Sequence, residues 1–151
     1  MPVEKSAGAV IFRKEEDKIY YLLLHYHSGH WEFVKGNIEK GEELKSTVKR
    51  EVKEETGIKD IKFINGFKEN IKYFYKLTQK KNQRFLTGQE EKTIFKIVTF
   101  FLAETKTKEV KISWEHAGFK WLPYEESLKQ LTFKNAKNIL KKADDLLKKY
   151  D

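Results

Sequence analysis

Residues 36–58 read GNIEKGEELKSTVKREVKEETGI and bring together Glu51, Glu54 and Glu55 near the end of a predicted helix over 43–56. The backbone dipole makes the C-terminal end of a helix slightly negative, so carboxylates there are mildly unfavourable. The chain as a whole carries a formal net charge of +8, from 31 Lys and Arg against 23 Asp and Glu. A basic protein that concentrates acid at this end of a helix therefore needs a physical reason to do so.

The helical phase supplies that reason. At about 100° per residue, Glu51 and Glu55 share a side with Leu44 and Val48, which would face the core. Buried carboxylates without partners are costly or become protonated, unless a cation compensates them. Clustered carboxylate oxygens suit hard divalent ions, above all magnesium or manganese. The alternative is an exposed helix face neutralised by basic neighbours, namely Lys49, Arg50 and Lys53.

The spacing of the stretch is more specific than its charge. It follows the pattern G-x5-E-x7-R-E-U-x-E-E-x-G-U, where U is a bulky aliphatic residue. All nine defined positions are matched, by Gly36, Glu42, Arg50, Glu51, Val52, Glu54, Glu55, Gly57 and Ile58. This stretch resembles the Nudix box, and the chain resembles Nudix hydrolases. The resemblance implies an α/β/α sandwich that hydrolyses a nucleoside diphosphate linked to another group.

The same resemblance implies roles for individual residues. Catalysis falls on Arg50, Glu51 and Glu54, with Glu51, Glu54 and Glu55 at the metal site and Arg50 orienting the acids through a salt bridge. The remaining motif positions would be structural: Glu42 supports the site, Gly36 shapes the loop before the helix, and Gly57 is well placed to end the helix.

The rest of the chain indicates one α/β domain over residues 1–151. A β-hairpin is predicted around the KEEDK turn, and its LLL run at 22–24 suggests a strand buried on both faces. Three-residue and four-residue spacing of apolar side chains predicts an amphipathic helix over 133–150. Strands and helices mix without a regular βαβ rhythm, which favours a sandwich with a mixed sheet. The predicted strands are 6–13, 19–27, 61–68, 71–77 and 94–104, and 77–92 is predicted to be a long loop or a hairpin tip.

Composition limits the partners. A surplus of positive charge favours nucleotides, phosphates or nucleic acid, although a lysine-rich surface that only confers solubility would have the same composition. There is no cysteine, which excludes disulfides and thiolate chemistry. No apolar run is long enough to span a membrane, and residues 1–8 have no signal-peptide core. We therefore expect a cytoplasmic protein with no membrane partner, and the sequence leaves its oligomeric state open.

A second, looser resemblance covers most of the chain. The segments AGAVIFR, YYLLLHYHSGHWEFVKGNIEKGEE, INGFKENIKYFY, FFLAE and SWEHAGFKWL together resemble asymmetrical diadenosine tetraphosphate hydrolases. That likeness implies a fourth metal-site glutamate at Glu115. It also implies a substrate-binding set in which His30, Lys35 and Lys96 meet phosphate, while Tyr73 or Tyr75 stacks on adenine.

Each of these assignments has a simpler alternative. Glu115 could be an ordinary loop acid, Lys96 an exposed lysine on a strand, and His30 the cap of a turn. Tyr73 and Tyr75 could be strand-forming aromatics without a ligand. Trp31 and Trp121 are expected to be structural.

Two features depart from the second family. Val34 stands where proline usually precedes the Lys-Gly pair, which would make that loop less rigid. The 77–92 segment is longer than in animal members, and such a segment could reshape the substrate pocket, so the choice of the aromatic that stacks on adenine stays open.

The resemblance implies metal-assisted attack of water on a phosphorus, with Glu54 as general base and diadenosine tetraphosphate cleaved to ATP and AMP. Three alternatives stay open: an RNA 5′-pyrophosphohydrolase, an ADP-ribose hydrolase and a catalytically silent nucleotide-binding module. The basic surface also suits an RNA end.

Overall fold

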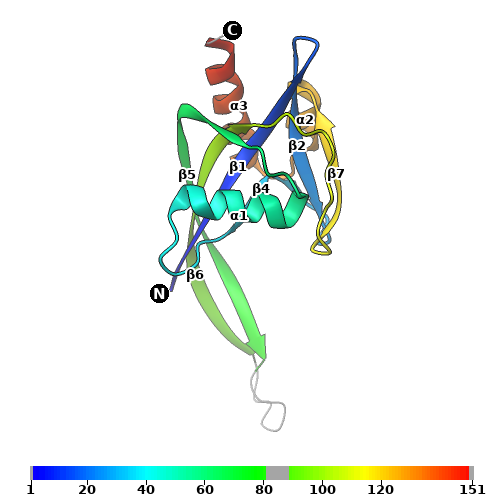
Figure 1. Ribbon diagram of the computed structural model, residues 1–151. Coiled ribbons are helices and arrows are strands. Elements are labelled where there is room, and N and C mark those ends of the chain that lie inside the picture. Colours follow the sequence, from blue (N-terminus) through cyan, green and yellow to red (C-terminus); the bar gives the residue numbers. More distant parts are fainter. Residues whose placement is uncertain (1, 81–88, 150–151) are drawn as a thin grey trace.

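A seven-stranded mixed sheet forms the centre of the computed structural model, which describes residues 2–80 and 89–149 (Figure 1). The strand order is β3-β2-β1-β6-β5, with β4 also paired to β1 and β7 to β2. The strands are β1 (Val3–Glu15), β2 (Lys18–Tyr26), β3 (Trp31–Glu32), β4 (Val34–Asn37), β5 (Lys62–Lys80), β6 (Gln89–Glu104) and β7 (His116–Leu122). The helices are α1 (Leu44–Thr56), α2 (Tyr124–Gln130) and α3 (Lys134–Lys149).

The predicted hairpin between β1 and β2 is confirmed, and its turn is tight. Glu15 pairs with Lys18, so Glu16 and Asp17 alone form the turn, with φ angles of 48° and 67°. Positive φ at both turn residues matches the right-handed twist of the flanking strands. The turn is therefore two residues long within the five-residue polar run that predicted it.

Strand β1 organises the sheet because it has three partners. Its C-terminal part pairs antiparallel with β2, and its residues 6–9 pair antiparallel with β4. Along its other edge it runs parallel to β6. The mixed sheet expected from the sequence is therefore confirmed. Its central strand also fixes the position of β4, which leads directly into the loop before α1.

Apolar side chains fill both faces of the sheet, as the LLL run predicts. Leu22 and Leu24 belong to the core under α1, which includes Val48, whereas Leu23 belongs to the core under α3, which includes Leu140. All three leucines are essentially inaccessible to water. Alternate side chains of a strand point to opposite faces, so the strand serves both cores. The α/β/α sandwich is confirmed, with α1 on one face and α3 on the other (Figure 1).

Strand β5 differs from the sequence prediction. The predicted strands 61–68 and 71–77 form one element, whose pairing with β6 shifts register between Phe63 and Lys68. Gly66 lies in that interruption with φ 89°, a value that favours glycine. The irregularity therefore lies within one strand and does not separate two strands. The pattern of side chains alone does not distinguish these two cases.

The two alternatives for residues 77–92 are also distinguished in part. The backbone of 77–80 pairs with that of 89–92, so β5 and β6 extend beyond their predicted ends as a hairpin. Figure 1 shows this hairpin projecting away from the sandwich. The centre of the predicted loop, residues 81–88, lies outside the described residues.

The C-terminal helix is confirmed, with two differences at its ends. It begins at Lys134, and Phe133, predicted as the first residue of the apolar stripe, precedes it with 49% of its surface exposed. Tyr150, the last predicted stripe residue, lies outside the described residues. The short elements β3, β4, β7 and α2 were not predicted, because each has too few residues to show a period.

Among residues 2–80 and 89–149, no helix is long and apolar enough to cross a membrane.

Candidate functional site

Helix α1 presents the acidic residues to the site. Val48 and Val52 pack into the core, and Glu55, one turn beyond Glu51, is buried with them. Gly57 ends the helix in the left-handed region at φ 76°, and its N–H donates to the Lys53 carbonyl. The predicted helix, its inward acid and its glycine stop are thus all present.

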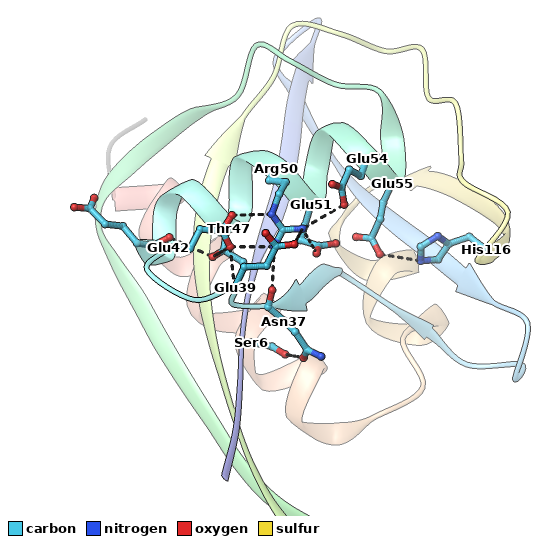
Figure 2. A network of polar contacts seen from close by, with 11 residues as sticks. Ser6, Asn37, Glu39, Glu42, Thr47, Arg50, Glu51, Glu54, Glu55 and His116 are labelled. Carbon is cyan, nitrogen blue, oxygen red and sulfur yellow. Dashed lines mark hydrogen bonds and ion pairs between the residues drawn. The ribbon is translucent and has the colours of Figure 1, made fainter. Parts of the chain in front are cut away.

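Arg50 makes five hydrogen bonds, four of which join it to acids of the box (Figure 2). Its Nε and Nη2 donate to the two carboxylate oxygens of Glu42 at 2.7 and 3.0 Å. Its Nη1 donates to Glu51 at 2.8 Å and to Glu54 at 3.3 Å. Nη2 also donates to the Asn37 carbonyl at 3.0 Å, which ties the helix to the end of β4. A planar guanidinium suits this arrangement because it offers five donors in a fixed fork.

Glu42 is the anchor for that guanidinium. Its carboxylate also accepts hydrogen bonds from Thr47 Oγ1 at 2.7 Å and from the Glu39 backbone N–H at 3.1 Å. The hydrogen bonds from Arg50, followed by that from Thr47, lower the pKa of Glu42 to about 2. Glu42 therefore stays ionised at neutral pH and holds Arg50 where it can reach Glu51 and Glu54.

Gly36 faces the carboxylate of Glu51. A Cβ atom built on Gly36 would lie 2.0 Å from the Cδ of Glu51, which is far too close for two carbon atoms that are not bonded to each other. Only glycine allows Glu51 to lie against the strand while Arg50 holds it from the other side. Gly36 was predicted to shape the loop before the helix. In the structure, the absence of a side chain at Gly36 leaves space for the Glu51 carboxylate.

Glu55 has an unusual environment for a charged group. Only 5% of its surface is exposed, and its Oε2 has no hydrogen-bond partner. Burial is the main cause that raises its pKa to about 8, and the negative charges of Glu51, Glu115 and Glu54 add to the effect. Burial also raises the pKa of Glu51. The protein alone therefore does not stabilise Glu55 in its ionised form at neutral pH.

His116, the first residue of β7, lies beside Glu55. Its Nε2 is 3.6 Å from Glu55 Oε1 and is itself buried without a hydrogen-bond partner (Figure 2). Burial lowers the pKa of His116, which favours its neutral form. The neighbouring Ser113 is tied to the helix, because its N–H donates to the Glu55 carbonyl at 3.2 Å. The segment that precedes β7 is thereby held against the acidic end of α1.

Several of these groups, but neither Glu42 nor His116, border one polar cavity of about 720 Å³. Its walls come from β1, β4, α1, β6 and the loop before β7. The cavity brings together most of the predicted site: Lys35, Gly36, Arg50, Glu51, Glu54, Glu55, Lys96 and Glu115. Glu115, predicted from the second resemblance, is exposed at this cavity.

The donor chemistry of the cavity suits a hard divalent cation. It gathers carboxylate oxygens, and the buried Oε2 of Glu55 lacks a partner. Hard cations such as magnesium bind carboxylate oxygen. Across residues 2–80 and 89–149, no three acidic or histidine side chains stand close enough together to hold a metal. Arg50 holds Glu51 and Glu54, so metal binding requires the carboxylates to turn toward one another.

Lys96 is buried, so the alternative of an exposed strand lysine is wrong. Its Nζ donates to Glu4 at 2.5 Å and to Asn37 Oδ1 at 3.0 Å. Glu4 also accepts a 2.6 Å hydrogen bond from the hydroxyl of Tyr75. Tyr75 is not among the described residues that border either the polar cavity or the apolar pocket described next. Its hydroxyl instead supports the Glu4–Lys96 pair.

A second pocket, of about 560 Å³, adjoins the polar cavity and shares Lys35 with it. We call it the apolar pocket. It contains Tyr73, His30 and Phe133, together with Phe100 from the core. Tyr73 and His30 are predicted substrate residues, but both lie here and not in the polar cavity. Phe133 was missed as a site residue, because its spacing placed it in the stripe of the C-terminal helix.

His30 is held by its neighbours in the apolar pocket. It stacks on Tyr26 with 4.5 Å between ring centroids, and its Nδ1 lies 2.8 Å from Ser28 Oγ. Its centroid is 5.3 Å from that of Phe133. Burial lowers the pKa of His30. A neutral imidazole among aromatic rings is better suited to contact a flat ring or to donate one hydrogen bond than to neutralise phosphate.

The two tryptophans expected to be structural make structural contacts. Trp31 stacks on His25 at 4.4 Å between centroids, and Trp121 Nε1 donates to the Lys108 carbonyl at 2.8 Å. Neither borders the polar cavity or the apolar pocket.

Comparison with known proteins identifies the family of the chain. Residues 3–143 match the NUDIX domain family model. The chain is 30% identical to the asymmetrical bis(5′-nucleosyl)-tetraphosphatase of Mus musculus over 155 residues, which cover 95% of each chain. It is 32% identical over 108 residues to an RNA pyrophosphohydrolase of Nitratiruptor, covering 68% of this chain and 64% of that protein. A crystal structure of a C. elegans Ap4A hydrolase binary complex superposes with a TM-score of 0.77 at 28% identity, covering 95% of this chain and 97% of that one. With the box complete and residues 3–143 matched by the family model, this chain belongs to the NUDIX domain family.

Proposed function

We propose that this protein hydrolyses dinucleoside polyphosphates, with diadenosine tetraphosphate cleaved to ATP and AMP. The observation that carries the proposal is the pair of adjoining cavities that share Lys35, one acidic and polar, the other apolar and aromatic. A nucleotide needs both environments, one for its phosphates and one for its base. The similarity to asymmetrical tetraphosphatases supports a substrate with a base at each end.

Glu51, Glu54, Glu55 and Glu115 would hold the metal, which we propose to be magnesium, with manganese as a substitute. Bound there, the metal would neutralise phosphate charge and lower the pKa of a water molecule. Arg50 would set the direction of Glu51 and Glu54 through its hydrogen bonds. At neutral pH, a bound cation would favour the ionised form of Glu55, because burial raises its pKa to about 8 in the protein alone.

Glu54 is our candidate for the general base. Its side chain is 57% exposed at the polar cavity, so water reaches it, and its hydrogen bond to Arg50 is long at 3.3 Å. A base must lie within hydrogen-bond reach of the proton that it removes. Of the four glutamates of the box, Glu54 has the most exposed side chain and is the most accessible to a water molecule entering the cavity.

Lys35 and Lys96 would contact the polyphosphate. Lys35 lies between the two cavities, where the phosphate next to a bound nucleoside would pass. Lys96 is held in place by Glu4 and Asn37. A positioned ammonium group stabilises negative charge that develops on a leaving phosphate without reorganising during the reaction. In the apolar pocket, we favour Tyr73 over Tyr75 as the ring that stacks on adenine, and His30 would border the same base.

An RNA 5′-pyrophosphohydrolase is the second candidate, favoured by the similarity to the Nitratiruptor protein and by the basic surface. Residues 1–151 would act as a single domain in the cytoplasm under either proposal.

The test is a substrate panel with purified protein and magnesium: diadenosine tetraphosphate, ADP-ribose and triphosphorylated RNA in water labelled with heavy oxygen. We expect ATP and AMP from the dinucleotide, with label in one product only. Its kcat/KM should exceed that of ADP-ribose by at least about tenfold, because a second stacked base adds roughly a factor of ten. It should also exceed that of triphosphorylated RNA. Two molecules of ADP, or faster turnover of RNA, would contradict the proposal.

A further inference from the structure

The loop between β6 and β7 places an exposed tryptophan at the polar cavity. Trp114 has 86% of its surface exposed, the largest exposure among the large hydrophobic residues that the structure describes. Among the described residues that border the polar cavity, it alone is aromatic. A fully solvated indole is unfavourable, since aromatic rings gain most of their free energy from burial. Its position at a ligand cavity suggests that the ligand covers it.

The backbone around Trp114 is fixed although the side chain is in water. Its carbonyl accepts a hydrogen bond from His27 Nε2 at 2.8 Å. The residue before it, Ser113, donates its N–H to the Glu55 carbonyl at 3.2 Å. The loop is therefore anchored both to the β2–β3 connection and to the end of α1. An anchored backbone with an exposed ring holds the ring beside the cavity at low entropic cost.

A substrate with two bases needs two sites for them. The apolar pocket, with Tyr73 and Phe133, accounts for one base, and Lys35 marks where the phosphates leave it for the polar cavity. The second nucleoside must then emerge elsewhere from the polar cavity. Trp114 is outside the apolar pocket and borders the polar cavity from the loop before β7. Its ring is thus available where the second base would emerge.

We propose that Trp114 is the stacking platform for the second, distal base of the substrate, and so determines the preference for ligands with two bases. This inference rests on the proposed function, because a mononucleotide would leave Trp114 uncovered. Stacking of a base on an aromatic ring tolerates any base, since every base has a π face. Trp114 would therefore confer a requirement for a second base and little selectivity for its identity.

The test measures affinity and not turnover. Two ligands are used, the analogues of diadenosine tetraphosphate and of adenosine tetraphosphate in which methylene groups replace the bridging phosphate oxygens. Each is titrated into the protein by calorimetry in the presence of magnesium. The proteins are wild type, Trp114→Ala and Trp114→Phe. Phe74→Ala is the matched control, because Phe74 is also exposed, at 62%, but borders neither cavity. Tryptophan emission is followed in parallel, with Trp114→Phe giving the contribution of the other two tryptophans.

We expect the wild type to bind the two-base ligand more tightly than the one-base ligand, with quenching of the Trp114 emission. Trp114→Ala should weaken the two-base ligand by about 5–150-fold and the one-base ligand by less than about twofold. Trp114→Phe should retain most of the affinity, and Phe74→Ala all of it. Equal weakening of both ligands, or none, would overturn the inference while leaving the proposed hydrolysis intact. Equal wild-type affinity for both ligands, without hydrolysis of a dinucleotide, would overturn both.

Discussion

Glu54→Gln is expected to lower kcat for diadenosine tetraphosphate by about 10²–10⁴-fold, the usual contribution of a positioned general base. The amide keeps the size of the side chain and can still contact Arg50, but it cannot accept the proton of the attacking water. Because the Glu54 side chain is 57% exposed and lies outside the core, the folded state should be unaffected. Steady-state kinetics together with a thermal melt separates these two effects.

Glu43→Gln is the matched control for Glu54→Gln. Glu43 is an exposed glutamate at the N-cap position of the same helix. Its side chain makes no capping hydrogen bond and does not border the polar cavity. The substitution removes one negative charge at the N-terminus of α1, as Glu54→Gln does within the helix, and should change kcat by less than about twofold. If Glu54→Gln reduced kcat no more than Glu43→Gln does, Glu54 would not be the base.

Gly36→Ala should also abolish most activity, for a steric reason. The new methyl group would overlap the Glu51 carboxylate, which would have to leave its place beside Arg50. A displacement of about 1 Å in a catalytic group can cost on the order of 10²-fold in rate. The fold should survive, since the clash is with the end of a side chain and Gly36 is not among the glycines with positive φ. We expect kcat/KM to fall about 100-fold with little change in the melting temperature.

Two further variants test whether Gly36 acts through Glu51. Gly118→Ala is the control, because a Cβ there meets no atom within 4 Å; it should be silent. Gly36→Ala should cost little more when added to Glu51→Gln, since both substitutions act on one carboxylate and their effects should not add. Full additivity, or a large loss of stability in Gly36→Ala, would show that Gly36 serves the backbone and not Glu51.

The part of the site that sequence predicted well is the part that local spacing determines. Helical phase alone places Glu55 inward, and its burial is confirmed. The glycine stop at Gly57 has the left-handed conformation that the sequence led us to expect. These features depend on interactions within about one helical turn, and the period of a helix is regular enough to carry them.

Contacts between distant strands were harder to predict. Phe133 fits the period of the C-terminal helix, but the chain enters that helix one residue later and leaves Phe133 in the apolar pocket. Tyr73 and Tyr75 look equivalent on one strand, and Glu4 comes within reach of Tyr75 only because β6 pairs with β1 on one edge and with β5 on the other. The space that Gly36 leaves for Glu51 likewise depends on how β4 packs on α1. None of these partners is near in sequence.

We propose that inward acids on α1 are tolerated because a divalent cation neutralises them, and the stability of the metal-free protein tests this proposal. Burial raises the pKa of Glu55 to about 8 from an ordinary 4.5. Between these values the folded state binds more protons than the unfolded state, so stability should fall as pH rises from about 4.5 to 8. Glu55→Gln removes the ionisable group and should remove this part of the pH dependence.

The decisive measurement is the melting temperature of wild type and Glu55→Gln at pH 8, in chelator and in magnesium or manganese. In chelator, Glu55→Gln should melt at a higher temperature than wild type. Only the wild type has a buried carboxyl group at this position, which must either carry a charge or bind a proton. Metal should raise the wild-type melting temperature clearly and that of Glu55→Gln much less. A wild-type protein that melts at the same temperature with and without metal, and is no less stable than Glu55→Gln in chelator, would contradict the account.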